Sequence, residues 1–584
     1  MTISMKIAIL PLLIAISTGA IANAGNAIDP MTREYITPVR IVWQKPDSVF
    51  SNAEALLVPG DGQVTLGKTG TCKIVNKECS SIILDFGKEI HGGLQIFTGP
   101  GSQVSTNLRI RFGESVGEAC SETVNQSGGK HGFSTNDHTQ RDILTSVSRW
   151  GFLELGNTGF RFVRIDVLSP GATINLKEVR AVARYRNLPY VGSFHCSDPR
   201  LDSIWNTAAY TVHLNMQEFL WDGIKRDRII WIGDMHPELH TIMSVFNDKE
   251  VVEASLDKIT EQFPLPRWVN NMSSYSLWYL IIHHDWYMHH ADLGFLKKHK
   301  DYITGLVRQI DGFTSEDGSE NLNPGSKRSD SRFLDWPSSP NAKGVEAGYR
   351  ALMSWALQCG EKLCKCLNDN ETAAIAHSAA QRLDAHIQAP NGLLQAAALM
   401  SLAGTMPAEE AANGYILKKG ASGFTTFYGY YMLEALARGG KYSEALGIIR
   451  DFWGAMIDLG ATSFWEDFNM NWRNNAARID ELTPEGKVDV HGTYGDYCYR
   501  GYRHSLCHGW ASGPCPWLTR HVLGISIAEP GCRELRIEPH LGDLQFAEGT
   551  FPTPYGTVRV RHEKRTDGSI SSEIHLPKGV KQVK

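Results

Sequence analysis

Hydrophobic and polar positions follow three different patterns along the chain. From about residue 25 to 190, runs rich in β-branched and aromatic residues alternate with a period of two and are separated by Gly and Pro. The clearest of these runs cover 81–99, 107–112 and 160–167. Such alternation is typical of antiparallel strands, and we expect an N-terminal β-sandwich domain at 25–190.

A helical period replaces this pattern from about 191 to 525. At 199–219 apolar residues recur at spacings of three and four, and Asp198 followed by Pro199 is typical of a helix start. Further helices are expected near 234–246, 249–262, 274–291, 293–311, 344–367, 371–388, 407–417, 425–438, 441–457 and 509–523. This many helices predict a ring of paired helices, an (α/α)6 toroid. A superhelical repeat array is the alternative, although we find no fixed period of about 34 or 40 residues.

From about 526 the strand pattern returns. Short runs at 535–537, 557–561 and 570–576 are accompanied by Asp567-Gly568, a hairpin signal between the last two. We expect a small C-terminal β-sandwich at 526–584. The predicted fold is therefore mainly α with flanking β domains, and the helical toroid at 191–525 is the expected catalytic domain.

The first residues are typical of a signal peptide. Lys6 precedes an apolar run at 7–16, and small residues follow up to Ala22-Asn-Ala24. We expect cleavage after Ala24 and export to the periplasm or the medium. A membrane anchor is the alternative, but the apolar run is shorter than the roughly 20 residues that a span requires.

Composition narrows the range of possible binding partners. The net charge of -5 leaves no basic excess for nucleic acid. Aromatic residues make up 10% of the chain, which suits sugar-stacking clefts as well as core packing. Among the 11 cysteines, Cys72 and Cys79 are spaced to close a short disulfide loop. The absence of paired C-x-x-C motifs argues against a structural zinc site.

The segment 222–234 places three Asp, one Lys and two Arg beside a block of apolar residues. A solvated helix face would separate its charges from such a block, and Gly223 and Gly233 favour a loop that lines a cavity. Burial beside arginines tunes carboxylates for binding or catalysis. A purely structural ion-pair loop is the alternative.

This segment resembles the signature of the α-L-rhamnosidase family, glycoside hydrolase family 78, which has an Asp, then Arg followed by an acid, then Trp-x-Gly-Asp. The matching residues are Asp222, Arg226, Asp227, Trp231 and Asp234. The resemblance implies that Asp222 and Asp234 bind sugar hydroxyls and that Asp227 protonates the leaving oxygen. We expect Arg226 and Trp231 to bind the sugar as well. The family usually has Glu at the position of Asp227, so this chain departs from it by one methylene.

A second match lies at 460–466, which resembles Gly-Ala-Thr-Thr-x-Trp-Glu of the same family. It implies that Glu466 is the general base that activates water in an inverting displacement, with Asp467 as the competing candidate. An inverting site needs two carboxyl groups roughly 6.5–9.5 Å apart. We therefore expect Asp227 and Glu466 to meet in one pocket.

Two further matches concern sugar contacts. At 505–514, His508 corresponds to a family His that contacts the sugar; a helix-capping core His is the alternative, and Trp510 is either a sugar platform or core. At 333–337 the segment resembles the family's Asp-Trp loop, which implies that Trp336 stacks on a deoxy sugar.

The run at 283–290 contains four histidines, yet no two of them stand four apart as in H-E-x-x-H sites. We expect neither a metal nor a cofactor.

Three functions remain open. The first is an exported inverting exo-glycosidase acting on terminal α-L-rhamnosyl or similar deoxy-sugar linkages. The second is a polysaccharide lyase of the helical toroid type, with Tyr494, Tyr497, Tyr499 and His508 as candidate groups. The third is a non-catalytic sugar-binding protein, suggested by Asp227 in place of Glu. All three take a carbohydrate partner, without nucleic acid or a membrane span.

Overall fold

The computed structural model describes residues 29–122, 141–321, 332–386, 388–495 and 501–584. The expected signal peptide, Tyr497 and Tyr499 lie outside the described residues. Residues Met31–Lys584 form a single unit.

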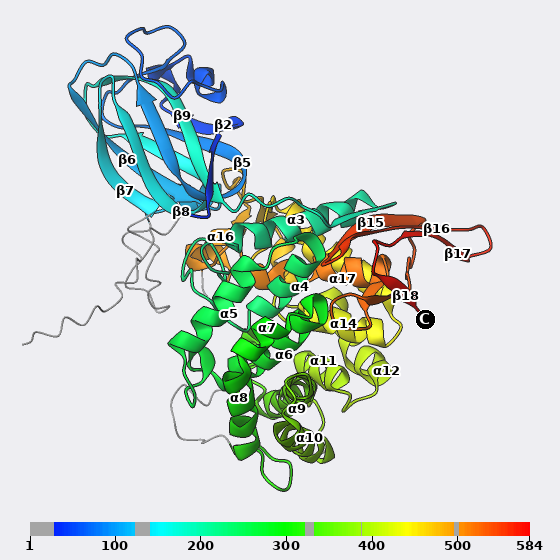
Figure 1. Cartoon of the computed structure of the whole chain (residues 1–584). Helices are drawn as coiled ribbons and strands as arrows, with labels where there is room; N and C mark the ends of the chain where they lie inside the picture. The colour runs from blue at the N-terminus through cyan, green and yellow to red at the C-terminus, as the bar shows by residue number, and fades with distance from the viewer. Residues whose placement is uncertain (1–28, 123–140, 322–331, 387, 496–500) are drawn as a thin grey trace, which may run out of the picture. The chain divides into compact units, whose positions relative to one another are not determined.

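The N-terminal part is an antiparallel β domain (Figure 1). Its strands are β1 (Thr32–Ile36), β2 (Arg40–Lys45), β3 (Phe50–Ser51), β4 (Cys72–Val75), β5 (Ser80–Thr98), β6 (Ser105–Gly113), β7 (Asp142–Ser148), β8 (Phe152–Val167) and β9 (Thr173–Tyr185). The long strand β5 pairs with β2 through its first residues and with β9 through its last, within one nine-stranded sheet. Gly92 allows the pairing with β9, because a Cβ there would lie 1.9 Å from the Val182 carbonyl oxygen. The expected strands at 81–99, 107–112 and 160–167 are confirmed.

The middle of the chain is helical. Its main helices are α3 (Pro199–Asn215), α4 (Met235–Val245), α5 (Glu250–Gln262), α6 (Ser273–His290), α7 (Leu293–Lys298), α8 (Lys300–Gly312), α9 (Ala342–Cys366), α10 (Asn370–Ala385), α11 (Leu394–Ala403), α14 (Gly429–Arg438) and α15 (Tyr442–Asp458). Asp198 caps α3 as expected, because its side chain accepts a hydrogen bond of 2.9 Å from the Arg200 amide.

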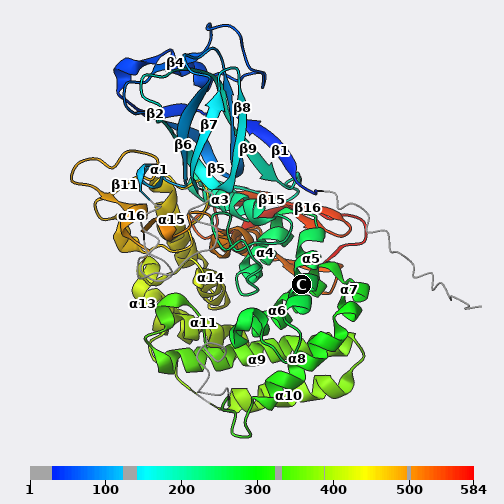
Figure 2. The ribbon, with the colours of Figure 1, turned by 90° about the vertical axis from the view of Figure 1, so that its left-hand side faces the viewer.

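These helices close into a ring. In the order α3, α4, α6, α9, α11, α14 and α15, each helix contacts the next, and α15 contacts α3 again. Helices α8 and α10 pack against α9 from outside this ring (Figure 2). A superhelical array would leave its first and last helices apart, so the closed ring confirms the toroid.

Two details of the helical prediction were wrong. Helix α11 was missed, because all of its residues are buried and a helix that is apolar on every side has no 3.6-residue period. The helix expected near 509–523 is three short pieces instead: η10 (Gly509–Ser512), α17 (Pro514–Trp517) and the π-helical η11 (Leu518–Val522). Pro514 and Pro516 lack the amide hydrogens that one continuous helix would use.

The C-terminal part is again β. It contains β13 (Ile525–Ile527), β14 (Glu534–Ile537), β15 (Phe546–Thr553), β16 (Gly556–Lys564), β17 (Ile570–His575) and β18 (Lys581–Val583). Strands β16 and β17 form the expected hairpin at Asp567-Gly568. Strand β10 (Ser193–Cys196), which precedes α3, pairs with β15 and so joins this C-terminal sheet.

The expected Cys72–Cys79 disulfide is wrong. Every cysteine that the structure describes is a free thiol. Cys72 lies on β4 with its side chain in the β-domain core, whereas Cys79 is exposed just before β5. The two side chains therefore lie in different environments. Within the described ranges, no helix has the length and apolar character needed to cross a membrane.

Candidate active site

The charged segment between α3 and α4 is a loop that backbone and side-chain hydrogen bonds hold in place. The Asp222 amide donates to the Ile229 carbonyl at 3.2 Å, and the Ile229 amide donates to Asp222 Oδ1 at 3.3 Å. Asp227 and Arg228 both take φ +55°, which turns the chain sharply between these two contacts. The Gly509 amide donates to the Asp222 carbonyl at 2.9 Å, so the loop is fixed to the segment that carries His508.

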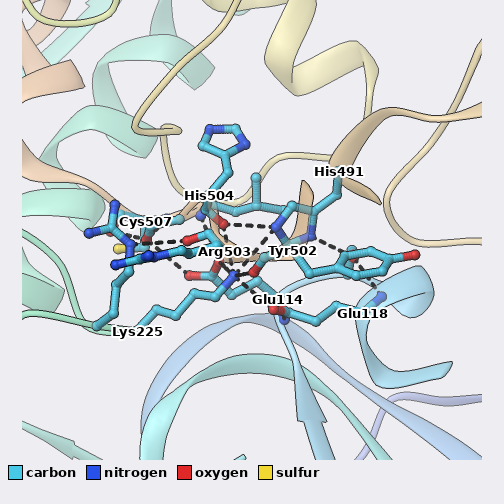
Figure 3. Close-up of polar contacts among 12 residues, drawn as sticks. Glu114, Glu118, Lys225, His491, Tyr502, Arg503, His504 and Cys507 are labelled. Carbon is cyan, nitrogen blue, oxygen red and sulfur yellow. Dashed lines mark hydrogen bonds and ion pairs between the residues drawn. The ribbon is translucent and has the colours of Figure 1, made fainter. Parts of the chain in front are cut away.

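Lys225 anchors the loop to the β domain (Figure 3). Its fully buried ammonium lies 2.7 Å from Glu118 and 3.2 Å from Glu114, and it donates to the His504 carbonyl at 2.8 Å. Arg228 likewise donates to the Asn157 carbonyl of β8 at 2.6 Å. The structural ion-pair interpretation therefore holds for Lys225, and Arg228 is held by a backbone carbonyl of the β domain.

Arg226 has a different environment. Its Nη1 donates to Asp227 at 3.2 Å, its Nη2 donates to Glu466, and its Nε donates to the Arg503 carbonyl at 3.0 Å. One guanidinium group thus contacts both of the carboxylates that the sequence singled out. Asp227 and Glu466 are 239 positions apart in the sequence, and their contacts with Arg226 bring them together.

The two carboxylates differ in accessibility. The Glu466 side chain is 3% exposed and the Asp227 side chain 22%. Burial alone would raise the pKa of Glu466, but the charges of Arg226 and His508 lower that pKa to about 2. Glu466 is therefore ionised at neutral pH, as a general base must be, while Asp227 is the member of the pair that an entering molecule can reach.

Glu466 is also fixed through its backbone. The indole of Trp510 donates to the Glu466 carbonyl at 2.9 Å, and the Thr426 hydroxyl donates to the same oxygen at 2.5 Å. Trp510 is buried and stacks on Phe427 with ring centroids 4.7 Å apart. Of the two roles considered for Trp510, the structure supports the core role.

Asp222 and Asp234 are buried beside this pair. Burial and the nearby Asp227 and Asp234 carboxylates raise the pKa of Asp222 well above its usual range. Burial also raises the pKa of Asp234, although hydrogen bonds from His508 and Tyr275 oppose that shift. Two buried carboxyl groups with raised pKa values can both donate and accept hydrogen bonds, which suits sugar hydroxyls.

His508 and Tyr275 hold Asp234 from two sides. His508 Nε2 lies 3.0 Å from Asp234 Oδ1, and the Tyr275 hydroxyl donates to Asp234 Oδ2 at 3.1 Å. His508 stands at the N-cap position of η10, but its side chain makes no capping hydrogen bond and contacts Asp234 instead. Tyr275 was missed, because it lies in the apolar sequence of α6, where it is indistinguishable from a core residue.

Aromatic rings continue from Tyr275 towards solvent. Trp231 meets Tyr275 edge to face at 5.8 Å, Tyr275 meets Phe333 at 6.0 Å, and Phe333 meets Trp336 at 5.4 Å. Trp336, at the end of this row, is 40% exposed. Asp335 fixes this turn, because its side chain accepts from the Trp336 amide at 2.9 Å and from Thr425 at 2.7 Å. Both predicted tryptophans are therefore connected to Asp234 through Tyr275.

The groups suggested for a lyase are arranged differently. Tyr494 stacks flat on Trp472, with ring centroids 5.2 Å apart and an interplanar angle of 5°. His508 is bonded to Asp234. Tyr497 and Tyr499 lie outside the described residues.

Comparison with known proteins gives consistent matches. The family model for the bacterial alpha-L-rhamnosidase 6 hairpin glycosidase domain matches residues 189–522, and the model for the bacterial alpha-L-rhamnosidase C-terminal domain matches residues 524–583. No curated protein matches the chain by sequence.

Solved structures share the fold at low identity. The GH78 family rhamnosidase of Bacillus sp. GL1 has a TM-score of 0.69 and 18% identity, covering 90% of this chain and 54% of its own. The alpha-L-rhamnosidase from Dictyoglumus thermophilum has a TM-score of 0.67 and 17% identity, covering 95% and 59%. A rhamnosidase from Klebsiella oxytoca with rhamnose bound has a TM-score of 0.65 and 20% identity, covering 84% and 96%. The chain thus spans little more than half the length of the first two.

Proposed function

The chain belongs to the bacterial alpha-L-rhamnosidase family, and from this premise we propose that it is an exported inverting exo-glycosidase that hydrolyses terminal α-L-rhamnosyl or similar deoxy-sugar linkages. The observation that carries the proposal is the Arg226 guanidinium, which contacts Asp227 on one nitrogen and Glu466 on another. Inverting hydrolysis uses two carboxyl groups of opposite protonation on either side of one anomeric carbon.

In the proposed reaction Glu466 takes a proton from a water molecule, whose oxygen attacks the anomeric carbon. The bond from that carbon to the glycosidic oxygen breaks on the opposite side, and Asp227 gives its proton to the departing oxygen. Water thus adds across the linkage, and both carboxyl groups return to their starting states by exchanging protons with solvent. Glu466 enters the cycle ionised because Arg226 and His508 outweigh its burial and lower its pKa to about 2.

The other residues hold the sugar or the carboxylates. Asp222, Asp234 and His508 are placed to bond ring hydroxyls, and Trp231 and Trp336 to cover the apolar face or methyl group of the sugar. All three kinds of donor nitrogen of Arg226 are engaged with protein oxygens, so we assign Arg226 to positioning the two carboxylates. An Asp at position 227 reaches less far than Glu, which requires the leaving oxygen to sit closer to the loop.

Product analysis by NMR tests the proposal. The protein is incubated with aryl α-L-rhamnosides and rhamnose-terminated oligosaccharides, and the anomeric proton of the released sugar is followed from the first turnover. We expect β-L-rhamnose first, as inversion requires, and loss of turnover in Glu466→Gln with sugar binding preserved. Release of the α-anomer first would contradict inversion, and an unsaturated product absorbing in the ultraviolet would identify a lyase.

Two outcomes bear on the remaining parts of the proposal. Rhamnose binding by calorimetry without release from any substrate would identify a non-catalytic sugar-binding protein. Export is tested separately, by expressing the full chain in a Gram-negative host and sequencing the N-terminus of the periplasmic protein. We expect it to begin at Gly25, since the A-x-A pattern ends at Ala24.

A further inference from the structure

A second group of polar side chains lies in the helical ring and includes none of the residues assigned above to the carboxylates or the sugar. His236 and His240 stand one helical turn apart on α4, and Asp285 faces them from α6. Their ligand-type atoms converge: His236 Nε2 and His240 Nε2 lie 3.1 and 3.0 Å from the same carboxylate oxygen of Asp285, and 3.3 Å from each other. From this geometry we infer that His236, His240 and Asp285 form a binding site for a divalent transition-metal ion of the Zn²⁺ class.

The distances fit a metal better than a hydrogen-bond network. Ligand atoms bound to one ion at about 2.1 Å lie about 3.0 Å apart at right angles and about 3.4 Å apart at tetrahedral angles. All three observed separations fall in that interval. In a metal-free network both histidines would direct an Nε2 hydrogen at one oxygen, although the two Nε2 nitrogens are only 3.3 Å apart. A shared cation removes that conflict, because both nitrogens then present lone pairs.

The donor set also fits. Two imidazoles at i and i+4 on one helix with a carboxylate from another are a recurring set of protein ligands for Zn²⁺ and similar ions.

Neighbouring residues contact the three proposed ligands and fix their orientation, as metal sites require. The second nitrogen of His236, Nδ1, lies 3.0 Å from the Tyr431 hydroxyl, and its ring stacks on Trp278 at 5.0 Å. The other oxygen of Asp285 lies 2.8 Å from His284 Nδ1. The three proposed ligands line a cavity of about 420 Å³, together with Tyr430, Glu434 and Arg520. Coordination positions of the ion that no side chain fills would therefore face this cavity and bind water.

The other cluster of this kind differs. Glu114, Glu118 and His491 also bring their ligand atoms together, but the Lys225 ammonium lies among them, 2.7 to 3.4 Å from each. That position is already taken by a cation of the protein. The inference therefore concerns the site at α4 and α6, and it is independent of the proposed hydrolysis.

Metal analysis of the purified full chain tests the inference. The protein is stripped with EDTA, dialysed against Zn²⁺ in the presence of a weak chelator, and assayed for zinc by mass spectrometry. We expect one equivalent in the wild type, a loss of affinity of at least about tenfold in His240→Ala and Asp285→Asn, and a loss of roughly 10- to 100-fold in Tyr431→Phe. His377→Ala, which replaces an exposed histidine on α10, is the matched control and should keep one equivalent.

Two further measurements complete the test, and the first needs only the wild type. Replacing Zn²⁺ by Co²⁺ should give visible ligand-field absorption, and added Zn²⁺ should raise the thermal midpoint of the wild type and of His377→Ala but not of His240→Ala. The inference is overturned if the stripped wild type takes up less than a tenth of an equivalent, if Co²⁺ gives no such absorption, or if His240→Ala binds zinc as tightly as the control.

Discussion

The Arg226 guanidinium is bound to the Glu466 carboxylate, and this pair lies buried although 240 positions separate the two residues. A buried ion pair contributes less to stability than its contact suggests, because both charges must leave water. Here the pair has an evident chemical consequence. The arginine keeps an enclosed carboxylate ionised and holds it beside Asp227.

Replacing Arg226 by Gln should move the acidic limb of the pH profile. In the wild type Glu466 has a pKa of about 2, so its protonation does not limit turnover near neutrality. Without the guanidinium, burial dominates and raises that pKa, and the base is then protonated over a wider acidic range. We expect the acidic limb of kcat/KM to shift upward by more than about one pH unit.

Arg226→Lys is the matched control, because it keeps the positive charge and loses only the planar fork. Its acidic limb should stay near that of the wild type even if kcat falls. If the acidic limb of Arg226→Gln lies at the same pH as that of the wild type, Glu466 is not the base whose pKa determines the limb.

Asp227→Asn should affect substrates according to their leaving group. Removing a general acid costs on the order of 10²- to 10⁴-fold when the departing oxygen needs a proton. A nitrophenyl leaving group needs little protonation, so its hydrolysis should fall far less than that of an alkyl rhamnoside. The measurement is kcat for both substrates in both proteins. Asp227→Glu, which keeps the acid, should retain more activity on the alkyl substrate. Equal losses on the two substrates would contradict the assignment of Asp227.

The fold was predictable where the chain follows a simple period. The strands β5, β6 and β8 were located from their runs of β-branched and aromatic residues between Gly and Pro, although most of β5 and the second half of β8 are buried on both faces. The amphipathic helices were located from their period, because each buries one face. Helix α11 could not be found in this way, since all of its residues are buried. The expected helix at 293–311 ends and restarts at His299, a boundary that its apolar spacing does not reveal.

The site was predictable only in part. The adjacent cations Lys225 and Arg226 look alike in sequence, yet one binds the β domain and the other the two carboxylates. This difference arises from tertiary contacts, and from the left-handed turn at Asp227 and Arg228, neither of which composition specifies. The i, i+4 spacing of His236 and His240 was visible in the sequence, but their partner Asp285 comes from another helix, so the spacing alone did not indicate a site.

Tyr275→Phe should weaken sugar binding more than it slows chemistry. The Tyr275 hydroxyl donates to Asp234, whose buried carboxyl group we assign to binding a sugar hydroxyl. Removing the Tyr275 hydroxyl leaves one oxygen of that carboxyl group without this hydrogen bond. A hydrogen bond to such a group contributes about 1.5 kcal/mol, which corresponds to roughly a tenfold increase in KM with little change in kcat. Tyr279→Phe on the same helix is the control, because its hydroxyl contacts His299 at 2.9 Å instead. A fall in kcat with unchanged KM would place Tyr275 in the chemical step instead.

Lys225→Met should destabilise the protein strongly, because it leaves Glu114 and Glu118 buried without their shared cation. Breaking a buried ion pair by removing one partner costs about 3–5 kcal/mol, and we expect a loss of that order in denaturant unfolding. Lys258→Met, which removes an exposed pair with Glu261, should leave the unfolding midpoint unchanged. Glu118 keeps a contact with Arg141 in this variant, so Glu114 is the carboxylate that loses its cation. The double variant Lys225→Met/Glu114→Gln removes that charge and should be more stable than Lys225→Met alone. If the double variant is instead as unstable as the two single losses added together, the ammonium and the carboxylate do not interact as the structure places them.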